Sequence, residues 1–276
     1  MRLLFIIIFT SFIYAKNPKI SFIAFENNKW RIIVCNGKFE CKSIKTQVEP
    51  RTFDYNFKDN TLVYIGSDKN LRLIKDSNES IILKKAKNAY TQPSFIDSKN
   101  ILLVELVNGN SKNTRFVKYN IISKKINTIH SQYSTSLDPY IYKKDLYYAN
   151  VSCVDGCGKI IEEIWHKDLV TNIANQLTLT NTLSFQPSIS KKGILYFSSM
   201  NNNSYHIYKL NTKNNLIKQI TFDNSVDLFP KPYKNGVLFI REKRGNYKLI
   251  YYNNGDIKTI PLDKKYKKIR DLKVEK

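Results

Sequence analysis

The sequence contains few of the residues and motifs that most often carry enzyme chemistry. Only three of its 276 residues are histidines. It has no Gly-x-Ser-x-Gly nucleophile elbow, no glycine-rich phosphate-binding loop and no His-Glu-x-x-His pair. A general base or a metal site needs several such groups to converge on one point. The signatures of serine hydrolases, nucleotide-binding enzymes and zinc proteases are therefore missing, and no cofactor is expected.

Acidic residues are also scarce. The chain carries 23 aspartates and glutamates against 45 lysines and arginines, so its net charge is +22. Nucleic acid is the usual partner of such a charge, but the export signal described below argues against it. Many lysines stand in turns, as in Lys143-Lys144 and Lys191-Lys192, which is typical of a solvated surface. Acidic proteins, lipid head groups and anionic cell-surface polymers remain as anionic partners.

Long hydrophobic runs are absent outside the N-terminus. Residues 1–15, MRLLFIIIFTSFIYA, combine one arginine, an apolar segment and a final alanine. The segment is shorter than the roughly 20 residues that span a bilayer, and it fits a signal peptide cleaved after Ala15. No cysteine follows it, so a lipid anchor at this point is not indicated. We expect an exported, periplasmic protein; the alternative is an uncleaved membrane anchor.

Linkers rich in proline, glycine or serine are missing from the rest of the chain, and no low-complexity tract interrupts it. Residues 16–276 are numerous enough to bury one large core. We therefore expect them to form a single domain.

The four cysteines occur as two close pairs. Cys35 and Cys41 flank an Asn-Gly turn signal, and Cys153 and Cys157 enclose three residues. An even number of cysteines in an exported chain favours disulfides over metal sites. Two cysteines without a nearby histidine also make a poor tetrahedral zinc site. We expect disulfides Cys35–Cys41 and Cys153–Cys157, and no metal site.

The most regular part of the chain is residues 185–222. It contains a proline-led strand, a turn over residues 190–193, an apolar run, a tyrosine-rich strand and a last strand over residues 216–221. Short runs of strand-forming residues, separated by clusters of glycine, asparagine and serine, predict an antiparallel meander. One such sheet cannot bury both of its faces alone, so copies of it are expected.

Similar segments recur about every 40 to 48 residues, which is the period of a four-stranded propeller blade. The proline-led strands begin near Gln92, Asp138, Gln186 and Leu228, and a copy without proline starts at Phe53. The second strand of each copy is a nearly continuous apolar run, which suits a strand covered on both faces. The repeats predict an all-β propeller.

The repeat resembles that of the periplasmic TolB family and its relatives with WD-like propeller repeats. The family's repeat has a proline-led inner strand, a glycine turn, an apolar strand, an Ile-Tyr strand and a closing Leu-Thr. The matching residues are Pro187, Gly193, Ile207-Tyr208 and Ile220-Thr221, with Pro230 and Gly236 in the next repeat. The resemblance covers almost all of residues 16–276. It implies a six-bladed β-propeller of four-stranded antiparallel blades.

The first blade is one strand short in sequence. The segments Lys19–Phe25, Trp30–Cys35 and Lys42–Val48 align with strands two to four of a repeat, because the signal peptide occupies the place of the inner strand. The C-terminal segment Ile269–Val274 is strand-like, and we expect it to complete this blade, since closure removes free sheet edges. The alternative is a disordered basic arm. Alternate side chains would face opposite sides of the blade, with Ile269, Asp271 and Lys273 on one side and Arg270, Leu272 and Val274 on the other.

The inner strands of a propeller surround a central channel, and the residues that begin them surround one mouth. We expect a binding site there, formed by Gln92, Asp138, Gln186 and Asp227. In the resembled family an acidic residue commonly stands three positions before the inner-strand proline, and Asp227 matches that position. The three histidines fall on third or fourth strands, away from the axis, so no catalytic residue is assigned.

Together these observations favour an exported, monomeric, non-enzymatic propeller that binds or scaffolds a protein in the cell envelope. Two alternatives remain open. One is an enzyme that acts on a carbohydrate or a peptide in the central channel, since some propellers are lyases or hydrolases. The other is a module that binds an anionic polymer through its lysine-rich loops.

Overall fold

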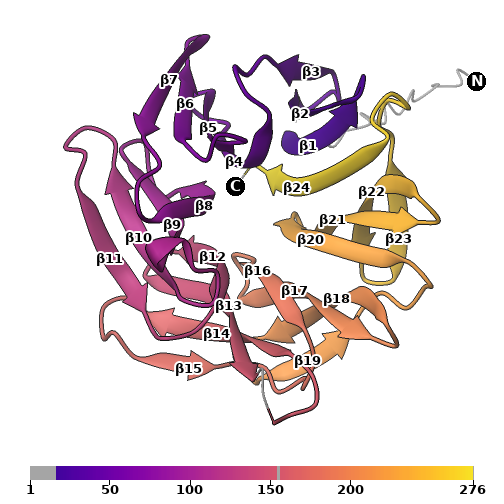
Figure 1. Ribbon diagram of the computed structural model, residues 1–276. Coiled ribbons are helices and arrows are strands. Elements are labelled where there is room, and N and C mark those ends of the chain that lie inside the picture. The colour runs from indigo at the N-terminus through magenta and orange to yellow at the C-terminus, as the bar shows by residue number, and fades with distance from the viewer. Residues whose placement is uncertain (1–16, 154–155, 276) are drawn as a thin grey trace, which may run out of the picture.

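The computed structural model describes residues 17–153 and 156–275. In this part, twenty-four strands form six antiparallel sheets of four strands each, arranged as a ring around a central axis (Figure 1). This confirms the predicted six-bladed propeller. The predicted signal peptide, residues 1–15, lies outside the described residues. None of the helical segments in the described ranges is long and apolar enough to cross a membrane.

Each sheet is one blade, and the strand nearest to the axis is its inner strand. From the axis outward, blade 1 consists of β24 (Lys268–Val274), β1 (Ile20–Glu26), β2 (Lys29–Cys35) and β3 (Cys41–Ile44). Blade 2 consists of β4 (Pro50–Asn56), β5 (Thr61–Gly66), β6 (Leu71–Lys75) and β7 (Asn78–Leu83). Blade 3 consists of β8 (Ala89–Phe95), β9 (Asn100–Leu106), β10 (Thr114–Asn120) and β11 (Ile126–Ser131), with the 3-10 turn η1 (Val107–Gly109) after β9.

The second half of the ring repeats the same order. Blade 4 consists of β12 (Ser136–Tyr142), β13 (Asp145–Cys153), β14 (Ile161–Asp168) and β15 (Ala174–Gln176). Blade 5 consists of β16 (Ser184–Ile189), β17 (Ile194–Asn201), β18 (Ser204–Asn211) and β19 (Leu216–Gln219). Blade 6 consists of β20 (Val226–Tyr233), β21 (Gly236–Lys243), β22 (Asn246–Asn253) and β23 (Asp256–Ile260).

The core lies between neighbouring blades. Strand β5 is buried along its whole length, and Ile23 and Ile32 of blade 1 pack with Phe53 and Tyr64 of blade 2. A strand covered on both faces can be apolar throughout. This is why the second strands read as continuous apolar runs.

Two of the outer strands are shorter than predicted. Strand β3 ends at Ile44 rather than near Val48, and β19 ends at Gln219 rather than at residue 221. Strand β15 is only three residues long and ends at Gln176. An outer strand has a neighbour on one side only, and the Leu179 side chain is 78% exposed. Strand formation depends on packing against neighbours more than on intrinsic preference, so an apolar residue alone does not extend the sheet here.

The two ends of the described chain close the ring. Strand β24 pairs with β1 in antiparallel register, with Ile20 opposite Val274 and Phe25 opposite Lys268 (Figure 1). This confirms that a C-terminal strand completes the first blade. The alternative, a loose basic arm, is wrong.

The side-chain directions of this closing strand differ from the prediction. Ile269 and Leu272 both pack into one core cluster and are 3% and 0% exposed, although strict alternation places them on opposite sides. Asp271 has a positive φ of 57°, and the pairing with β1 shifts register at this point. Such a bulge adds one residue to a strand and redirects the side chains after it. The predicted alternation over residues 269–274 is therefore wrong.

The same bulge recurs in four other inner strands. In each of them a residue with positive φ stands immediately before the proline, and the pairing with the second strand shifts register there. These residues are Gln92, Asp138, Gln186 and Phe229. A positive φ is unfavourable for residues other than glycine, so these positions need compensating contacts at the axis.

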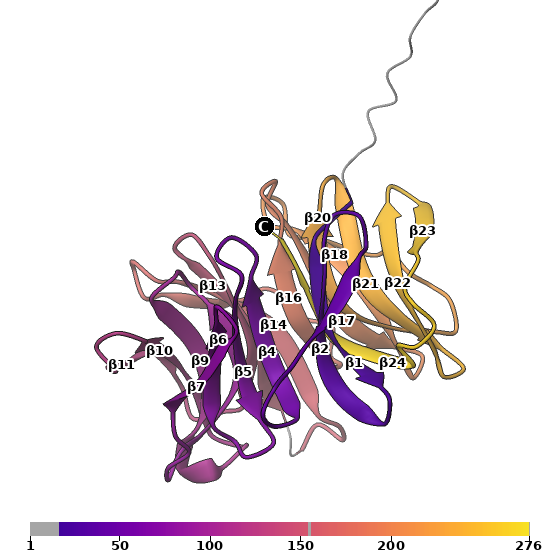
Figure 2. The same cartoon turned by 90° about the horizontal axis from the view of Figure 1, so that it is seen from above.

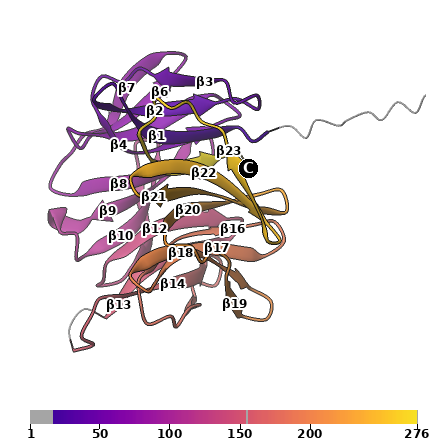
Figure 3. The same cartoon turned by 90° about the vertical axis from the view of Figure 1, so that its right-hand side faces the viewer.

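The strands run between the two faces of the ring, so the turns that connect them lie on these faces (Figure 2, Figure 3). The turns that follow five of the inner strands all lie on one face, because equivalent strands of every blade run in the same direction. We call it the mouth face. Its five turns are residues 57–60, 96–99, 143–144, 190–193 and 234–235.

Candidate functional site

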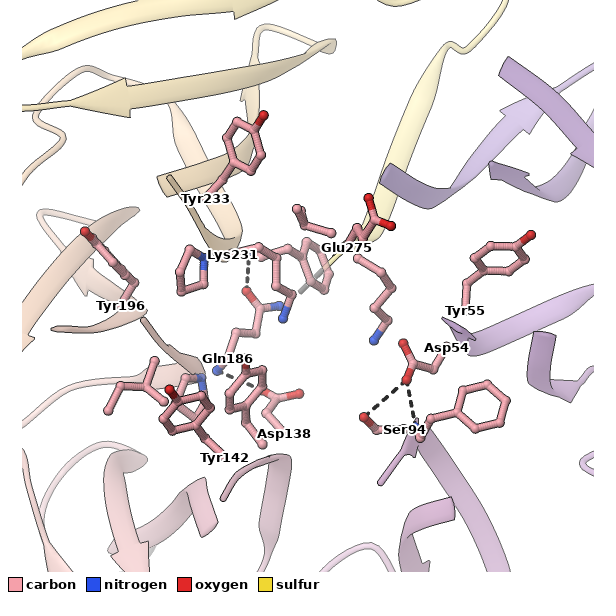
Figure 4. A pocket seen from close by; sticks show the side chains of 18 of the residues that line it. Asp54, Tyr55, Ser94, Asp138, Tyr142, Gln186, Tyr196, Lys231, Tyr233 and Glu275 are labelled. Carbon is pink, nitrogen blue, oxygen red and sulfur yellow. Dashed lines mark hydrogen bonds between the residues drawn. The ribbon is translucent and has the colours of Figure 1, made fainter. Parts of the chain in front are cut away.

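The inner strands enclose a cavity of about 1030 Å³ on the axis of the ring. All six inner strands line it, together with four of the turns on the mouth face. The cavity is therefore the central channel of the propeller, widened toward the mouth face. Figure 4 shows side chains from several blades pointing into this space.

A belt of hydrogen bonds links the inner strands around the axis. At five of the six blade junctions, a backbone N–H of one inner strand donates to a side-chain oxygen of the preceding one. The donors and acceptors are Phe53 N to Asp271 Oδ2 (3.2 Å), Gln92 N to Thr52 Oγ1 (3.1 Å), Asp138 N to Gln92 Oε1 (2.8 Å), Gln186 N to Asp138 Oδ2 (3.1 Å) and Phe229 N to Gln186 Oε1 (2.7 Å). At the sixth junction the equivalent side chain is that of Phe229, which has no acceptor.

The belt explains the residues found at the bulges. Gln92, Asp138 and Gln186 each use a side-chain oxygen to hold the strand of the next blade, and Gln92 Nε2 also donates to Asp138 Oδ1 at 2.6 Å. The structure thus brings three of the four sequence-predicted site residues together at the axis. Their side chains have partners within the ring, and a direct role in ligand binding stays a prediction.

The fourth predicted residue, Asp227, lies elsewhere. Its side chain is 0% exposed and does not line the cavity. Both carboxylate oxygens accept hydrogen bonds from Arg241, from Nε at 2.7 Å and from Nη2 at 2.8 Å. Its placement at the channel mouth is therefore wrong. In blades 3 to 5 the axial residue stands directly before the inner-strand proline, and in blade 6 that position is Phe229, two residues after Asp227.

The three histidines also lie outside the cavity, on third and fourth strands as predicted. His130 and His206 are buried, and His166 Nε2 is 2.8 Å from Asp145 Oδ1. Burial lowers the pKa of His130 to about 4, with a smaller effect of the same sign from Lys167. His130 is therefore neutral over the physiological pH range.

Aromatic side chains form much of the cavity wall. Figure 4 shows Tyr55, Tyr142, Tyr196 and Tyr233 arranged around Gln186 near the middle. The aromatic residues of the lining are Tyr55, Phe57, Phe95, Tyr140, Tyr142, Tyr196, Phe229 and Tyr233. A concave, largely aromatic surface with a few placed polar groups is the usual chemistry of a ligand site.

Every carboxylate that lines the cavity has donors within the protein. Asp54 accepts from Phe95 N at 2.8 Å and from Ser94 Oγ at 3.3 Å, and Glu275 forms an ion pair with Lys19 at 2.7 Å. Asp97 accepts from two backbone N–H groups of its own turn. Asp138 and Asp271 take part in the belt. These acids are therefore already stabilised.

The two lysines of the lining that lie on inner strands, Lys231 and Lys273, differ in whether they have a carboxylate partner. Lys273 Nζ lies 3.0 Å from Asp271 Oδ1. Lys231 Nζ lies over the ring of Tyr140, 5.9 Å from its centroid, and among the described residues no oxygen lies within hydrogen-bond distance of it. Lys231 follows the bulge and proline of β20. Lys231 was not predicted from the sequence, although its place directly after the inner-strand proline Pro230 is the signal that points to it.

The pKa values of the two lysines shift in opposite directions. It lowers the pKa of Lys231 to about 8, and Lys273 lowers it further, against the attraction of Asp271, Asp138 and Asp54. Burial also acts to lower the pKa of Lys273, but the ion pair with Asp271 and the charges of Asp54 and Asp138 together outweigh this, and the pKa is raised. Lys231 therefore has a lower pKa than Lys273 and loses its proton first as pH rises.

Glu162, which does not line the cavity, lies close enough to the cavity residue Asp138 for their charges to interact. Burial, and then the charge of Asp138, raise the pKa of Glu162 to about 8. Burial likewise raises the pKa of Asp138. The sequence cannot show this proximity, because Glu162 begins the third strand of blade 4 and Asp138 lies on its inner strand. Within residues 17–153 and 156–275, no three His, Cys, Asp or Glu side chains are placed to hold a metal ion.

Both predicted disulfides are confirmed. Cys35 is bonded to Cys41 and Cys153 to Cys157. The first joins the facing ends of β2 and β3, and the second follows the end of β13. Neither lies at the cavity.

Comparisons with known proteins agree with this architecture. No protein-family model and no curated protein matches the sequence. Among solved structures, TolB from Acinetobacter baumannii aligns with a TM-score of 0.73 and 12% identity, over 92% of this chain and 66% of that one. A putative TolB from Agrobacterium tumefaciens aligns with a TM-score of 0.64 and 12% identity, over 88% of both chains. An oligogalacturonate lyase in complex with manganese aligns with a TM-score of 0.60 and 11% identity, over 87% of this chain and 73% of that one.

The chain thus spans slightly less than two thirds of the length of the Acinetobacter protein. Identities near 12% show a shared fold, and one propeller fold supports several unrelated functions. On the repeats, the six closed blades and these alignments, the chain has the six-bladed β-propeller fold of TolB-like proteins.

Proposed function

We propose that the protein is a non-catalytic binding module of the cell envelope, which holds a segment of a partner protein in its central cavity. The observation that carries the proposal is the cavity itself. It measures about 1030 Å³, opens on the mouth face and takes wall residues from all six blades. Pockets of roughly 300–1,000 Å³ are the usual size of ligand sites, so this one accepts a peptide-sized segment.

The chemistry of the wall supports binding rather than catalysis. Rings such as those of Tyr142 and Phe57 offer a large contact area at low conformational cost. The belt residues that reach the axis are held by hydrogen bonds to their neighbours. The histidines, which most often serve as general bases, stand away from the cavity.

The cellular location is part of the proposal. Residues 1–15 have the composition of a signal peptide, and the chain contains two disulfides, which form and persist in oxidising compartments such as the periplasm. The partner is therefore an envelope protein, and the module acts as a monomer.

Affinity capture tests the proposal. Epitope-tagged protein is recovered from its native envelope fraction in three forms: unchanged, with Tyr142→Ser and Phe57→Ser in the cavity wall, and with Tyr133→Ser. Tyr133 is 91% exposed and does not line the cavity. The cavity variant should lose a partner that the unchanged protein and the Tyr133 variant retain. Equal capture by all three forms overturns the proposal.

An enzyme is the second candidate, and one observation favours it. Glu162 has a pKa of about 8, so it holds a proton at neutral pH, as a general acid must. Its position beyond the cavity lining weakens this candidate. Incubation with short oligogalacturonates and with peptides tests it: product formation that is lost in Glu162→Gln would support the enzyme, and its absence leaves the binding module.

A further inference from the structure

We infer that the segment held in the cavity is an acidic, extended polypeptide, which places a carboxylate on Lys231 and meets a collar of lysines at the mouth. This inference rests on the proposed function and names the chemistry of the partner. It follows from the charges of the lining, from their partners and from the exposed edges of the inner strands.

The first step is an asymmetry between acids and bases in the cavity. Each of its carboxylates already has a donor within the protein, as described above. Among the cations of the lining that the structure describes, only Lys273 has a carboxylate partner. The lining therefore has positive groups that can bind an anionic ligand, whereas its carboxylates already have donors. The cations without a carboxylate partner are Arg51, Lys58, Lys191, Lys192, Lys231, Lys234 and Arg270.

The second step concerns Lys231, a half-buried member of this group that lies on the inner strand β20. Removing an ammonium group from water is costly unless an acceptor replaces the lost hydration. Burial in the cavity lowers the pKa of Lys231, so the charged form of this amine is destabilised there. Its three donors face no acceptor among the described residues. A ligand carboxylate would supply the acceptor and the counter-charge together.

The third step concerns the rim. The five turns of the mouth face carry seven exposed lysines, which we call the lysine collar. They are Lys58, Lys99, Lys143, Lys144, Lys191, Lys192 and Lys234. Only Lys144 forms an ion pair in the described structure, with Asp168 at 3.8 Å. The same turns also carry two exposed acids, Asp59 and Asp97, so lysines outnumber acids there by seven to two. An excess of positive charge around a cavity attracts and orients an oppositely charged segment before it enters.

The fourth step distinguishes a polypeptide from an acidic polysaccharide. Every inner strand is the last strand of its sheet on the axial side. An edge strand presents backbone N–H and C=O groups to its free side. The belt uses one of these N–H groups in each of five inner strands, and an extended peptide can pair with the edge groups outside the belt as an added strand. A polysaccharide has no backbone amide to match these groups. The edges therefore favour a peptide.

The affinity for an acidic segment should decrease as pH rises. The charged and titratable groups around Lys231 are Asp54 from β4, Asp138 and Tyr140 from β12, and Asp271 and Lys273 from β24. Only protonated Lys231 attracts a carboxylate, so affinity should fall as pH rises through about 8. Exposed lysines titrate near 10.4. The collar therefore remains charged in this range. Glu162 also titrates near pH 8, so the profile is measured in Glu162→Gln as well, where the remaining loss belongs to Lys231.

Fluorescence anisotropy with two labelled probes tests the inference. One probe is a short peptide of alternating glutamate and tyrosine, and the other has glutamine in place of glutamate. The protein is used unchanged, as Lys231→Met, as Lys191→Gln with Lys192→Gln, and as Lys218→Met. Lys218 is an exposed lysine of the outer strand β19 and does not line the cavity.

The glutamate peptide should bind the unchanged protein and the Lys218 variant equally, and about tenfold more weakly to Lys231→Met. The collar variant should lose affinity mainly at low salt. The glutamine peptide should bind weakly to every form. If Lys231→Met does not fold, the pH profiles of the unchanged protein and of Glu162→Gln decide, because in both the affinity for the glutamate peptide must fall through about pH 8.

Any of the following results overturns the inference. They are equal binding of the two peptides, undiminished binding by Lys231→Met, and binding of a short oligogalacturonate in preference to the glutamate peptide, which would identify an acidic polysaccharide. Failure of both peptides to bind also overturns it. The proposed function is judged separately by affinity capture: a partner lost in the Tyr142 and Phe57 variant but retained by Lys231→Met leaves the binding module and refutes the acidic segment.

Discussion

Buried polar residues in this protein differ in whether they have a partner. Asp227 is fully buried and holds Arg241 through two hydrogen bonds. His130 is buried between the rings of Phe116 and Tyr148 and has no hydrogen-bond partner for Nε2 among the described residues. Lys231 is a half-buried amine that lines the cavity. The first residue contributes to stability, the second makes stability depend on pH, and the third is available to a ligand.

The Asp227–Arg241 pair gives a prediction about stability. Asp227→Asn leaves the buried Arg241 guanidinium with only the partly exposed Asp223 as a carboxylate partner. Removing one member of a buried pair typically costs about 3–5 kcal/mol. Urea unfolding should show a loss of this size. The matched control is Asp223→Asn at the exposed end of the same network, which should cost less than about 1 kcal/mol. Equal effects of the two changes would contradict this account.

His130 gives a prediction about pH. Its pKa is about 4 in the folded protein and near 6.5 in an unfolded chain. Between these values the unfolded state binds a proton that the folded state does not, so stability falls as pH falls from about 6.5 to about 4. His130→Phe keeps a ring at this position and removes the proton. Urea unfolding at several pH values should then show a shallower loss in this window, by up to roughly 3 kcal/mol. An unchanged slope would contradict it.

At the scale of elements, the inner strands are the most constrained part of the fold. Their bulges place side-chain oxygens where the next blade's backbone N–H points, and this links five of the six junctions. The sixth junction lies between blades 6 and 1, where Phe229 interrupts the belt. There the closing strand β24 packs against β20 and contributes Ile269 and Leu272 to the core. Apolar packing thus replaces the missing hydrogen bond.

Deleting residues 267–276 tests the contribution of β24. Ile269 and Leu272 are 3% and 0% exposed, and full burial of each such side chain contributes about 1.5–3 kcal/mol. The deletion also exposes the edge of β1. It should cost several kcal/mol, a large fraction of the ~5–15 kcal/mol typical of a domain. Thermal unfolding should show a much lower midpoint, whereas the exposed Lys268→Gln control should unfold near the original midpoint. A midpoint unaffected by the deletion would mean that the ring closes in another way.

Most of the architecture could be predicted because it depends on local, repeated signals. The proline and glycine of one repeat, Pro187 and Gly193, have equivalents in the next repeat, Pro230 and Gly236. The inner strand that blade 1 lacks at the N-terminus is supplied by the strand-like segment Ile269–Val274. The details at the axis could not be predicted, because each bulge is set by contacts between blades. Asp227 shows the consequence: its place three positions before Pro230 points to the mouth, whereas its side chain is fully buried and holds Arg241. Lys231 was missed for the same reason.

At the scale of the whole molecule, the protein is a closed ring with one widened, aromatic cavity on its axis and a surplus of positive charge. Closure leaves no inner strand paired on its axial side, so the cavity is the place where these edges are accessible. The lysine collar surrounds its entrance on the mouth face. Shape, edges and charge therefore point to the same site.

Export is a prediction about the whole chain. If residues 1–15 are a signal peptide, N-terminal sequencing of protein extracted from the envelope should begin at Lys16. The two disulfides then form after transport. Recovery of the chain with Met1 in a membrane-bound pool would identify an uncleaved anchor instead.

Site-specific photocrosslinking in the native envelope tests the central claim most directly. A photoreactive phenylalanine analogue replaces either Tyr142, in the cavity wall, or Tyr133, which is 91% exposed outside it. The account predicts one defined adduct with an envelope protein from position 142, absent from position 133, whose crosslinked peptide is rich in aspartate or glutamate. No adduct from position 142, or the same adducts from both positions, would contradict the claim that the central cavity holds a partner.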